Sequence, residues 1–79
     1  MSAPLERIAV IGAGLVGSSI ALAARAAGAG PVRITDRDPM VRTRAAVLEV
    51  ADQVCEDLAS TVGDAEVVIA AVPTEAVAE

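Results

Sequence analysis

Residues Ile8–Ser19 read IAVIGAGLVGSS, an apolar run that leads without a break into the glycines Gly12, Gly14 and Gly17. Such a stretch is compatible with a phosphate-binding turn, a membrane segment or a flexible joint. Spanning a membrane takes about 20 predominantly apolar residues, and the uncharged run from Ile8 to Ala24 is shorter and holds three glycines and two serines. The Glu6–Arg7 pair before it lacks the positive charge of a secretory leader. The membrane interpretation is therefore disfavoured.

The remainder of the chain alternates between strand and helix patterns. Apolar, β-branched runs predict strands, and segments rich in Ala and Leu that end at glycine predict helices. We expect strands at 7–11, 32–35 and 67–72, and helices at 15–27, 39–50 and 56–62. Residues 51–55 are expected to be a connector with a short extended piece at Val54–Cys55. Thr74–Glu79 is typical of the opening of a further helix.

Local signals also predict how the helices begin and pack. Asp38 suits the cap of the second helix, and Pro39 suits its first position. Small side chains allow a helix to lie close to a sheet, so we expect both long helices to pack through small or aliphatic residues. These residues are Ile20, Ala23, Ala24 and Ala27 in the first helix, and Val41, Ala45 and Leu48 in the second.

This order of elements predicts an α/β fold, the first βαβαβ half of a doubly wound parallel-sheet Rossmann fold. Because the last helix stops after about one turn, residues 1–79 are expected to be a partial, truncated NAD(P)-binding domain without a catalytic or substrate domain. In the usual strand order the first strand would then be an unprotected edge. We therefore expect poor stability alone, and self-association or pairing with a missing C-terminal half.

The glycines have the spacing Gly-x-Gly-x-x-Gly between a strand and a helix, which is the context that a dinucleotide-binding turn requires. Gly12 permits the tight turn, Gly14 lets a pyrophosphate approach the backbone, and Gly17 allows the helix to pack closely. The phosphates would face free amides at the helix N-terminus, which includes Leu15 and Val16. The absence of a Gly-Lys-Ser/Thr sequence argues against a nucleoside-triphosphate loop.

Asp36 ends the second strand, 19 residues after Gly17. This is close to the spacing of about 20 residues expected for the acid that binds the adenine ribose. A carboxylate there would accept hydrogen bonds from the ribose hydroxyls and repel a 2′-phosphate, which favours NAD over NADP. Arg37 is a further candidate, since it could reach a 2′-phosphate or stack on the adenine. Val72 and Pro73, at the end of the third strand, would border the nicotinamide-side ribose.

Composition narrows the remaining function classes. The chain has 6 basic and 11 acidic residues, a net charge of −5, whereas a nucleic-acid-binding protein would show a basic stripe. It contains no histidine, so the commonest general base and metal ligand is absent, and we expect neither a catalytic residue nor a metal site. Its single cysteine, Cys55, is expected to fill apolar space and favours a reducing compartment, hence the cytoplasm.

Three segments together resemble the N-terminal part of prephenate and arogenate dehydrogenases, enzymes of tyrosine biosynthesis. The segments are IAVIGAGLVGSSIALAARAAG, ITDRDP and DAEVVIAAVP, and the likeness runs from Arg7 to Pro73. It implies NAD(P)-dependent oxidative decarboxylation, with Gly12, Gly14, Gly17 and Asp36 at the family's cofactor positions. The histidine and the substrate-binding arginines of that family lie beyond the third strand, so their positions do not exist in this chain.

Two other interpretations remain open. Pyrroline-5-carboxylate reductases, 3-hydroxyacid dehydrogenases and related two-domain dehydrogenases have similar opening segments. A small nucleotide-binding module without enzymatic activity would share the glycine turn and the acid after the second strand.

Overall fold

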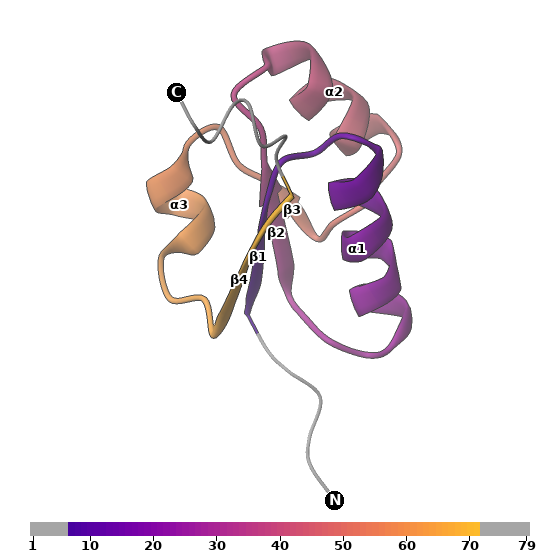
Figure 1. Ribbon diagram of the computed structural model, residues 1–79, viewed down its shortest axis with the longest axis vertical. Coiled ribbons are helices and arrows are strands. Elements are labelled where there is room, and N and C mark those ends of the chain that lie inside the picture. Colours follow the sequence, from indigo (N-terminus) through magenta and orange to yellow (C-terminus); the bar gives the residue numbers. More distant parts are fainter. Residues whose placement is uncertain (1–6, 72–79) are drawn as a thin grey trace, which may run out of the picture.

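The computed structural model describes residues 7–71, and these form four parallel strands and three helices (Figure 1). The elements are β1 (Ile8–Ile11), α1 (Leu15–Ala26), β2 (Val32–Thr35), α2 (Pro39–Val47), β3 (Gln53–Val54), α3 (Leu58–Val62) and β4 (Val67–Ala70). The α/β half-Rossmann architecture predicted from the sequence is confirmed. Val72, Pro73 and the expected helix at Thr74–Glu79 lie outside the described residues.

The strand order is β3-β2-β1-β4, with every neighbouring pair parallel. Val10 of β1 pairs with Ile34 of β2 on one side and with Ile69 of β4 on the other. The expectation that the first strand is an unprotected edge is therefore wrong. The two residues of β3 form an additional strand that pairs with β2. The strand expected as the third, at residues 67–72, is therefore the fourth along the chain, and it pairs with the other side of β1.

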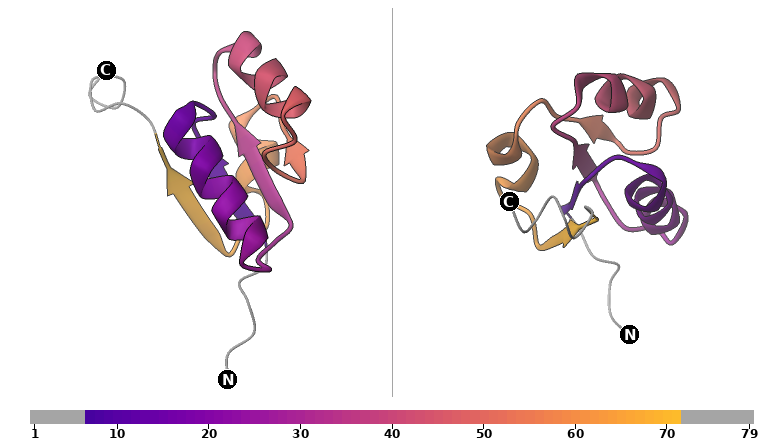
Figure 2. Two further views of the ribbon diagram at one scale, coloured as in Figure 1. Left: turned by 90° about the vertical axis from the view of Figure 1, so that its right-hand side faces the viewer. Right: turned by 45° about the horizontal axis from the view of Figure 1, so that its top comes forward.

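Helices cover both faces of the sheet. The two agreeing views place α1 and α2 on one face and α3 on the other (Figures 1 and 2). Because successive side chains of a strand alternate between faces, Val10 and Ile34 point toward the first face. Ala9 and Thr35 point toward the second, where α3 packs on β1 and β2 and buries Thr61.

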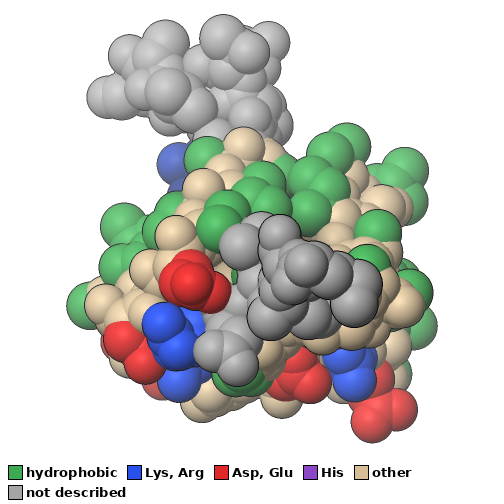
Figure 3. All heavy atoms as spheres, turned by 90° about the horizontal axis from the view of Figure 1, so that it is seen from below, with side chains coloured by type: hydrophobic (Ala, Val, Ile, Leu, Met, Phe, Trp, Pro, Cys, Tyr) green, Lys and Arg blue, Asp and Glu red, His purple; other side chains and the backbone are tan. Residues whose placement is uncertain are grey.

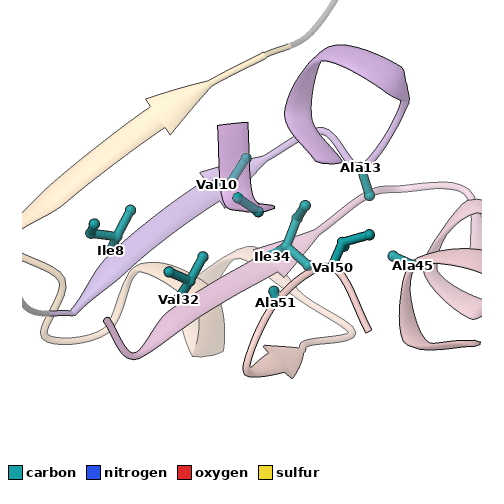
Figure 4. Packing of buried hydrophobic residues seen from close by; sticks show 9 residues of the cluster. Ile8, Val10, Ala13, Val32, Ile34, Ala45, Val50 and Ala51 are labelled. Carbon is teal, nitrogen blue, oxygen red and sulfur yellow. The ribbon is translucent and has the colours of Figure 1, made fainter. Parts of the chain in front are cut away.

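The core lies mainly between the sheet and the helices α1 and α2. Aliphatic side chains of β1 and β2 meet alanines of the helices and the segment that follows α2 (Figure 4). The buried cluster consists of Ile8, Val10, Ala13, Ala21, Val32, Ile34, Ala45, Val50 and Ala51. Cys55 is buried and free, as its expected role as an apolar filler requires.

The packing face of α1 differs in part from expectation. Gly17 and Ala21 are buried and Ile20 and Ala24 are partly buried, whereas Ala23 and Ala27 are exposed. Ala23 lies outside the narrow stripe that an α-helix presents to the surface that it packs on, and Ala27 is the C-cap that follows the end of α1.

The helix α2 is shorter than the expected span of 39–50. It begins as predicted, with Asp38 at the cap and Pro39 at the first position, but ends at Val47, with Leu48 as the C-cap. Val41 and Ala45 face inward, whereas Leu48 is exposed. The early end frees Val50 to turn into the core, which a continuing helix would prevent.

The strand β4 was expected to be fully buried and to reach residue 72. It ends at Ala70, and its residues alternate between half-buried and exposed, with Val68 49% exposed. Within residues 7–71 it pairs only with β1, and the described helices leave part of its α3-side face uncovered (Figure 2). Among the described residues, β4 is therefore a partly exposed strand at one end of the sheet.

The amino-terminal ends of the strands carry charged side chains. Arg7 and Arg33 lie 3.8 Å and 3.3 Å from the carboxylate of Asp64, and acidic and basic side chains lie side by side in this view (Figure 3). Among the described residues, no helix is long and apolar enough to cross a membrane. The features described below lie at the opposite, carboxyl-terminal end of the strands.

Candidate functional site

The turn between β1 and α1 is held to the neighbouring strand and to the helix that it opens. The amide of Gly12 donates to the carbonyl of Thr35 at 2.8 Å, and the amide of Ser18 donates to the carbonyl of Gly14 at 2.9 Å. The hydroxyl of Ser18 donates to the carbonyl of Ala13 at 3.0 Å. These contacts fix the turn at the carboxyl-terminal edge of the sheet, where doubly wound folds bind their ligands.

The three glycines of the turn meet different surroundings. Gly12 has a φ of 106°, a conformation that only glycine adopts without strain. A Cβ on Gly17 would overlap the carbonyl oxygen of Gly12 and lie 2.8 Å from its carbon. Gly14 has an ordinary φ of −73°, and a Cβ there would have no described heavy atom within 4 Å beyond its chain neighbours.

Gly12 and Gly17 are therefore required by the fold, but Gly14 is not. Neither its backbone conformation nor any described neighbour excludes a side chain at this position. The open space in front of Gly14 lies at the N-terminus of α1, where a dinucleotide pyrophosphate would approach the backbone. The residues present thus fit a dinucleotide.

The N-terminus of α1 has no cap from a side chain and no acidic residue in its first turn. The first four amides of a helix lack intrahelical acceptors, and here they belong to Gly14, Leu15, Val16 and Gly17. The side chain of Leu15 is 86% exposed and that of Val16 is 64% exposed, so neither covers this end. The helix dipole adds about half a positive charge at the same place, which favours an anion.

Asp36 follows β2 directly, and its half-buried carboxylate reaches back to the turn. Its Oδ2 accepts from the amide of Ala13 at 2.9 Å, and its Oδ1 accepts from the amide of Asp38 at 2.9 Å. A carboxylate offers about four acceptor positions, so both oxygens can accept a further hydrogen bond. The predicted ribose acid therefore lies beside the predicted phosphate turn.

Arg37 is exposed, and among residues 7–71 its guanidinium makes no hydrogen bond or ion pair. Arg42 lies nearer to the site, because its Nη1 donates to the backbone carbonyl of Asp36 at 2.7 Å. Val72 and Pro73, the other candidates, lie outside the described residues. The structure thus brings together the glycine turn and Asp36, and leaves Arg37 at the rim.

Two residues that contact Asp36, Ala13 and Arg42, were not predicted from the sequence. Ala13 is an unspecified position of the glycine motif, and Arg42 is one of two arginines in α2. Neither residue type signals a role, because both act through contacts with Asp36 that only the fold creates. The described residues contain no group of three or more side chains that could hold a metal ion.

Residues 7–79 match the family described as NADP oxidoreductase, coenzyme F420-dependent. The match covers the whole of the described sheet, the glycine turn and Asp36. The chain belongs to this family.

A cyclohexadienyl dehydrogenase gives a second comparison. Over 72 residues the chain is 39% identical to the cyclohexadienyl dehydrogenase of Zymomonas mobilis subsp. mobilis (strain ATCC 31821 / ZM4 / CP4). The alignment covers 90% of this chain and 25% of that protein. The chain therefore spans about a quarter of the length of the relative, and its resemblance to the N-terminal part of the prephenate dehydrogenase family is confirmed. Together the two comparisons identify the chain as an NAD(P)-binding domain of oxidoreductase type.

Proposed function

We propose that this chain is the NAD-binding portion of a prephenate- or arogenate-dehydrogenase-like oxidoreductase of tyrosine biosynthesis. The observation that carries the proposal is the open space at Gly14. The fold does not require a glycine there, whereas a pyrophosphate seated on the amides of α1 would. The named relative, a cyclohexadienyl dehydrogenase, supports the substrate class.

The choice of NAD over NADP rests on Asp36. A 2′-phosphate at the ribose would lie against a carboxylate that already accepts two backbone amides, and like charges at such distances repel. The family's description names NADP, and Arg37 has an exposed guanidinium that would suit a 2′-phosphate. The carboxylate is the fixed group of the two, so we infer that it decides the preference.

A bound NAD supplies a hydride acceptor, and the described residues supply its binding and orientation. The amides of Gly14, Leu15, Val16 and Gly17 would hold the pyrophosphate, and Asp36 would hold the ribose hydroxyls. No histidine occurs in the chain, so we propose that the catalytic residues belong to another part of the enzyme and that these 79 residues are inactive alone.

We also propose that the chain acts in the cytoplasm.

We further propose that a partner covers the open edge of β4. Val68 and Ala70 are exposed on this edge, and no charged residue interrupts the strand. Such edges pair readily with other strands. Self-association or a C-terminal half of the same domain would both cover it. Sedimentation of the isolated chain tests this, and a monomer with a sharp cooperative melt would contradict it.

Titration of the ¹⁵N-labelled chain with NAD and with NADP tests the nucleotide assignment. We expect NAD to shift the amides of Gly14, Leu15 and Val16, and to bind at least about tenfold more tightly than NADP. Asp36→Ala should weaken NAD binding by about tenfold or more, because it removes hydrogen bonds to a charged acceptor. Equal affinities for the two nucleotides would overturn the choice of NAD. No shift with either would overturn the dinucleotide site.

The second candidate is the opening half of another two-domain dehydrogenase, of the pyrroline-5-carboxylate reductase or 3-hydroxyacid dehydrogenase type. The family match favours it equally, because that match covers only the nucleotide-binding part. A nucleotide-binding module without activity is the third. The coding sequence that follows Glu79 separates them, since a prephenate-type enzyme must continue into helices that carry histidine and arginine.

A further inference from the structure

The carboxylate of Asp36 joins the glycine turn, whose Ala13 lies 23 residues earlier in the chain, to the loop that opens α2. One oxygen accepts from Ala13 in the glycine turn, and the other accepts from Asp38 in the loop that opens α2. The backbone carbonyl of Asp36 is itself held by the guanidinium of Arg42 at 2.7 Å. Asp36 is therefore fixed from both ends before any ligand binds.

Ala13 depends on this carboxylate. The residue is 4% exposed and lies between Gly12, with its φ of 106°, and Gly14, at the cap of α1. Its amide belongs to neither the β1 ladder nor the helix, and its carbonyl is taken by the hydroxyl of Ser18 at 3.0 Å. Without Asp36 the amide would be a buried donor with no acceptor, which is costly in a folded protein.

We propose that Asp36 is a positioning residue for the glycine turn, so that one carboxylate couples the phosphate and ribose halves of the site. The identity of the ligand at the turn rests on the proposed function, whereas the contact between Asp36 and Ala13 does not. It implies that altering Asp36 weakens the binding of ligands that contain no ribose. A group that only contacted ribose would have no such effect.

Inorganic pyrophosphate is the probe that separates the two roles. It has no ribose, and it carries negative charge that the Asp36 carboxylate repels. If Asp36 only contacts ribose, Asp36→Asn should strengthen pyrophosphate binding by removing that repulsion. If Asp36 positions the turn, the same variant should weaken it, because an asparagine has one acceptor oxygen and must present its NH₂ to one of the two amides.

The experiment is amide hydrogen exchange and pyrophosphate titration on the full ¹⁵N-labelled chain. In the unaltered chain, the Ala13 amide should exchange more slowly than those of Leu15 and Val16, which have no cap. In Asp36→Asn, exchange at Ala13 should rise by about tenfold or more, with Val10 in β1 unchanged. Pyrophosphate affinity should fall.

Asp38→Asn is the matched control. It alters another carboxylate of the same loop, one that accepts from the amide of Met40 and not from the turn. It should leave Ala13 exchange and pyrophosphate affinity unchanged. Ala13 exchange in the unaltered chain needs no substitution, so it tests the Asp36 contact even if Asp36→Asn does not fold.

The outcomes separate this inference from the proposed function. Unprotected Ala13 in the unaltered chain, or stronger pyrophosphate binding in Asp36→Asn, overturns the positioning role even where NAD binds. If Ala13 exchanges slowly in the unaltered chain and faster in Asp36→Asn, the positioning role is supported. If the same chain binds pyrophosphate but not NAD, the NAD assignment is overturned.

Discussion

The N-termini of the three described helices are built in two ways. Asp38 caps α2 by accepting from the amide of Met40 at 2.9 Å, and Asp57 caps α3 by accepting from the amide of Ser60 at 2.6 Å. The longest helix, α1, begins at a glycine with no side-chain cap. Caps stabilise helices by about 1 kcal/mol each, so α1 lacks a contribution that the two shorter helices have.

This difference singles out the start of α1 as the described helix end whose amides have no side-chain cap. An aspartate at the start of α1 would satisfy its amides and place a negative charge where an anion is expected to bind. The glycine instead leaves both the amides and the space in front of them open. The capped ends serve stability, and the uncapped end is suited to an anion.

Gly17→Ala should have the largest effect. Its Cβ would overlap the carbonyl of Gly12, and this obstacle is backbone, which cannot rotate away as a flexible side chain can. We expect a loss of about 3 kcal/mol of unfolding free energy, or failure to fold. Urea denaturation followed by circular dichroism measures it. A variant as stable as the unaltered chain would show that α1 can shift away from the turn.

Gly14→Ala is the matched partner, three residues earlier in the same motif. Its Cβ would meet no described atom within 4 Å, and the backbone already has an ordinary φ. We expect stability to change by no more than about 1 kcal/mol. NAD binding should weaken by about tenfold or more, because the methyl group stands where the pyrophosphate approaches. If the variant folds and binds NAD as tightly as the unaltered chain, the open helix end at Gly14 does not differ from the capped ends in the way proposed.

The smallest effect concerns the cap of α3. The backbone hydrogen bond from Ser60, followed by that from its side chain, holds the pKa of Asp57 below its ordinary value, against slight desolvation. A carboxyl with a lowered pKa in the folded chain stabilises at pH values above its ordinary pKa. That stabilisation is lost as the pH falls through the lowered pKa.

Urea denaturation at several pH values between about 5 and 2 measures this loss. Asp57→Ser provides the control, because a hydroxyl can cap the helix without titrating in this range. Its unfolding free energy should fall less steeply with acid than that of the unaltered chain. Identical slopes would show that the Asp57 cap contributes nothing to acid sensitivity.

The sequence predicted those features that depend on neighbouring residues. The glycine turn, the Asp38–Pro39 start of α2 and the position of Asp36 after β2 are all local signals, and the structure has each of them. Strand order is not local, because an apolar run does not specify its neighbour. The short extended piece expected at Val54–Cys55 was therefore not counted as a strand of the sheet, and β1 was predicted at an edge instead of the centre.

The contacts within the site were beyond sequence reasoning for the same reason. The hydrogen bond from Ala13 to Asp36 joins residues 23 positions apart, and it forms only because β1 and β2 are adjacent and in register. Arg42 reaches the same residue from the next helix. Spacing indicates which residue types are present, whereas the sheet determines which of their atoms meet.

The open space at Gly14 has a consequence for how such chains diverge. A copy that does not bind the proposed nucleotide must still keep glycine at positions 12 and 17 in order to fold. Position 14 is under no such constraint, so neutral drift would fill it with a larger residue. Among descendants of this chain, the residue at position 14 would therefore distinguish lineages still selected for binding from those retained only as folded proteins.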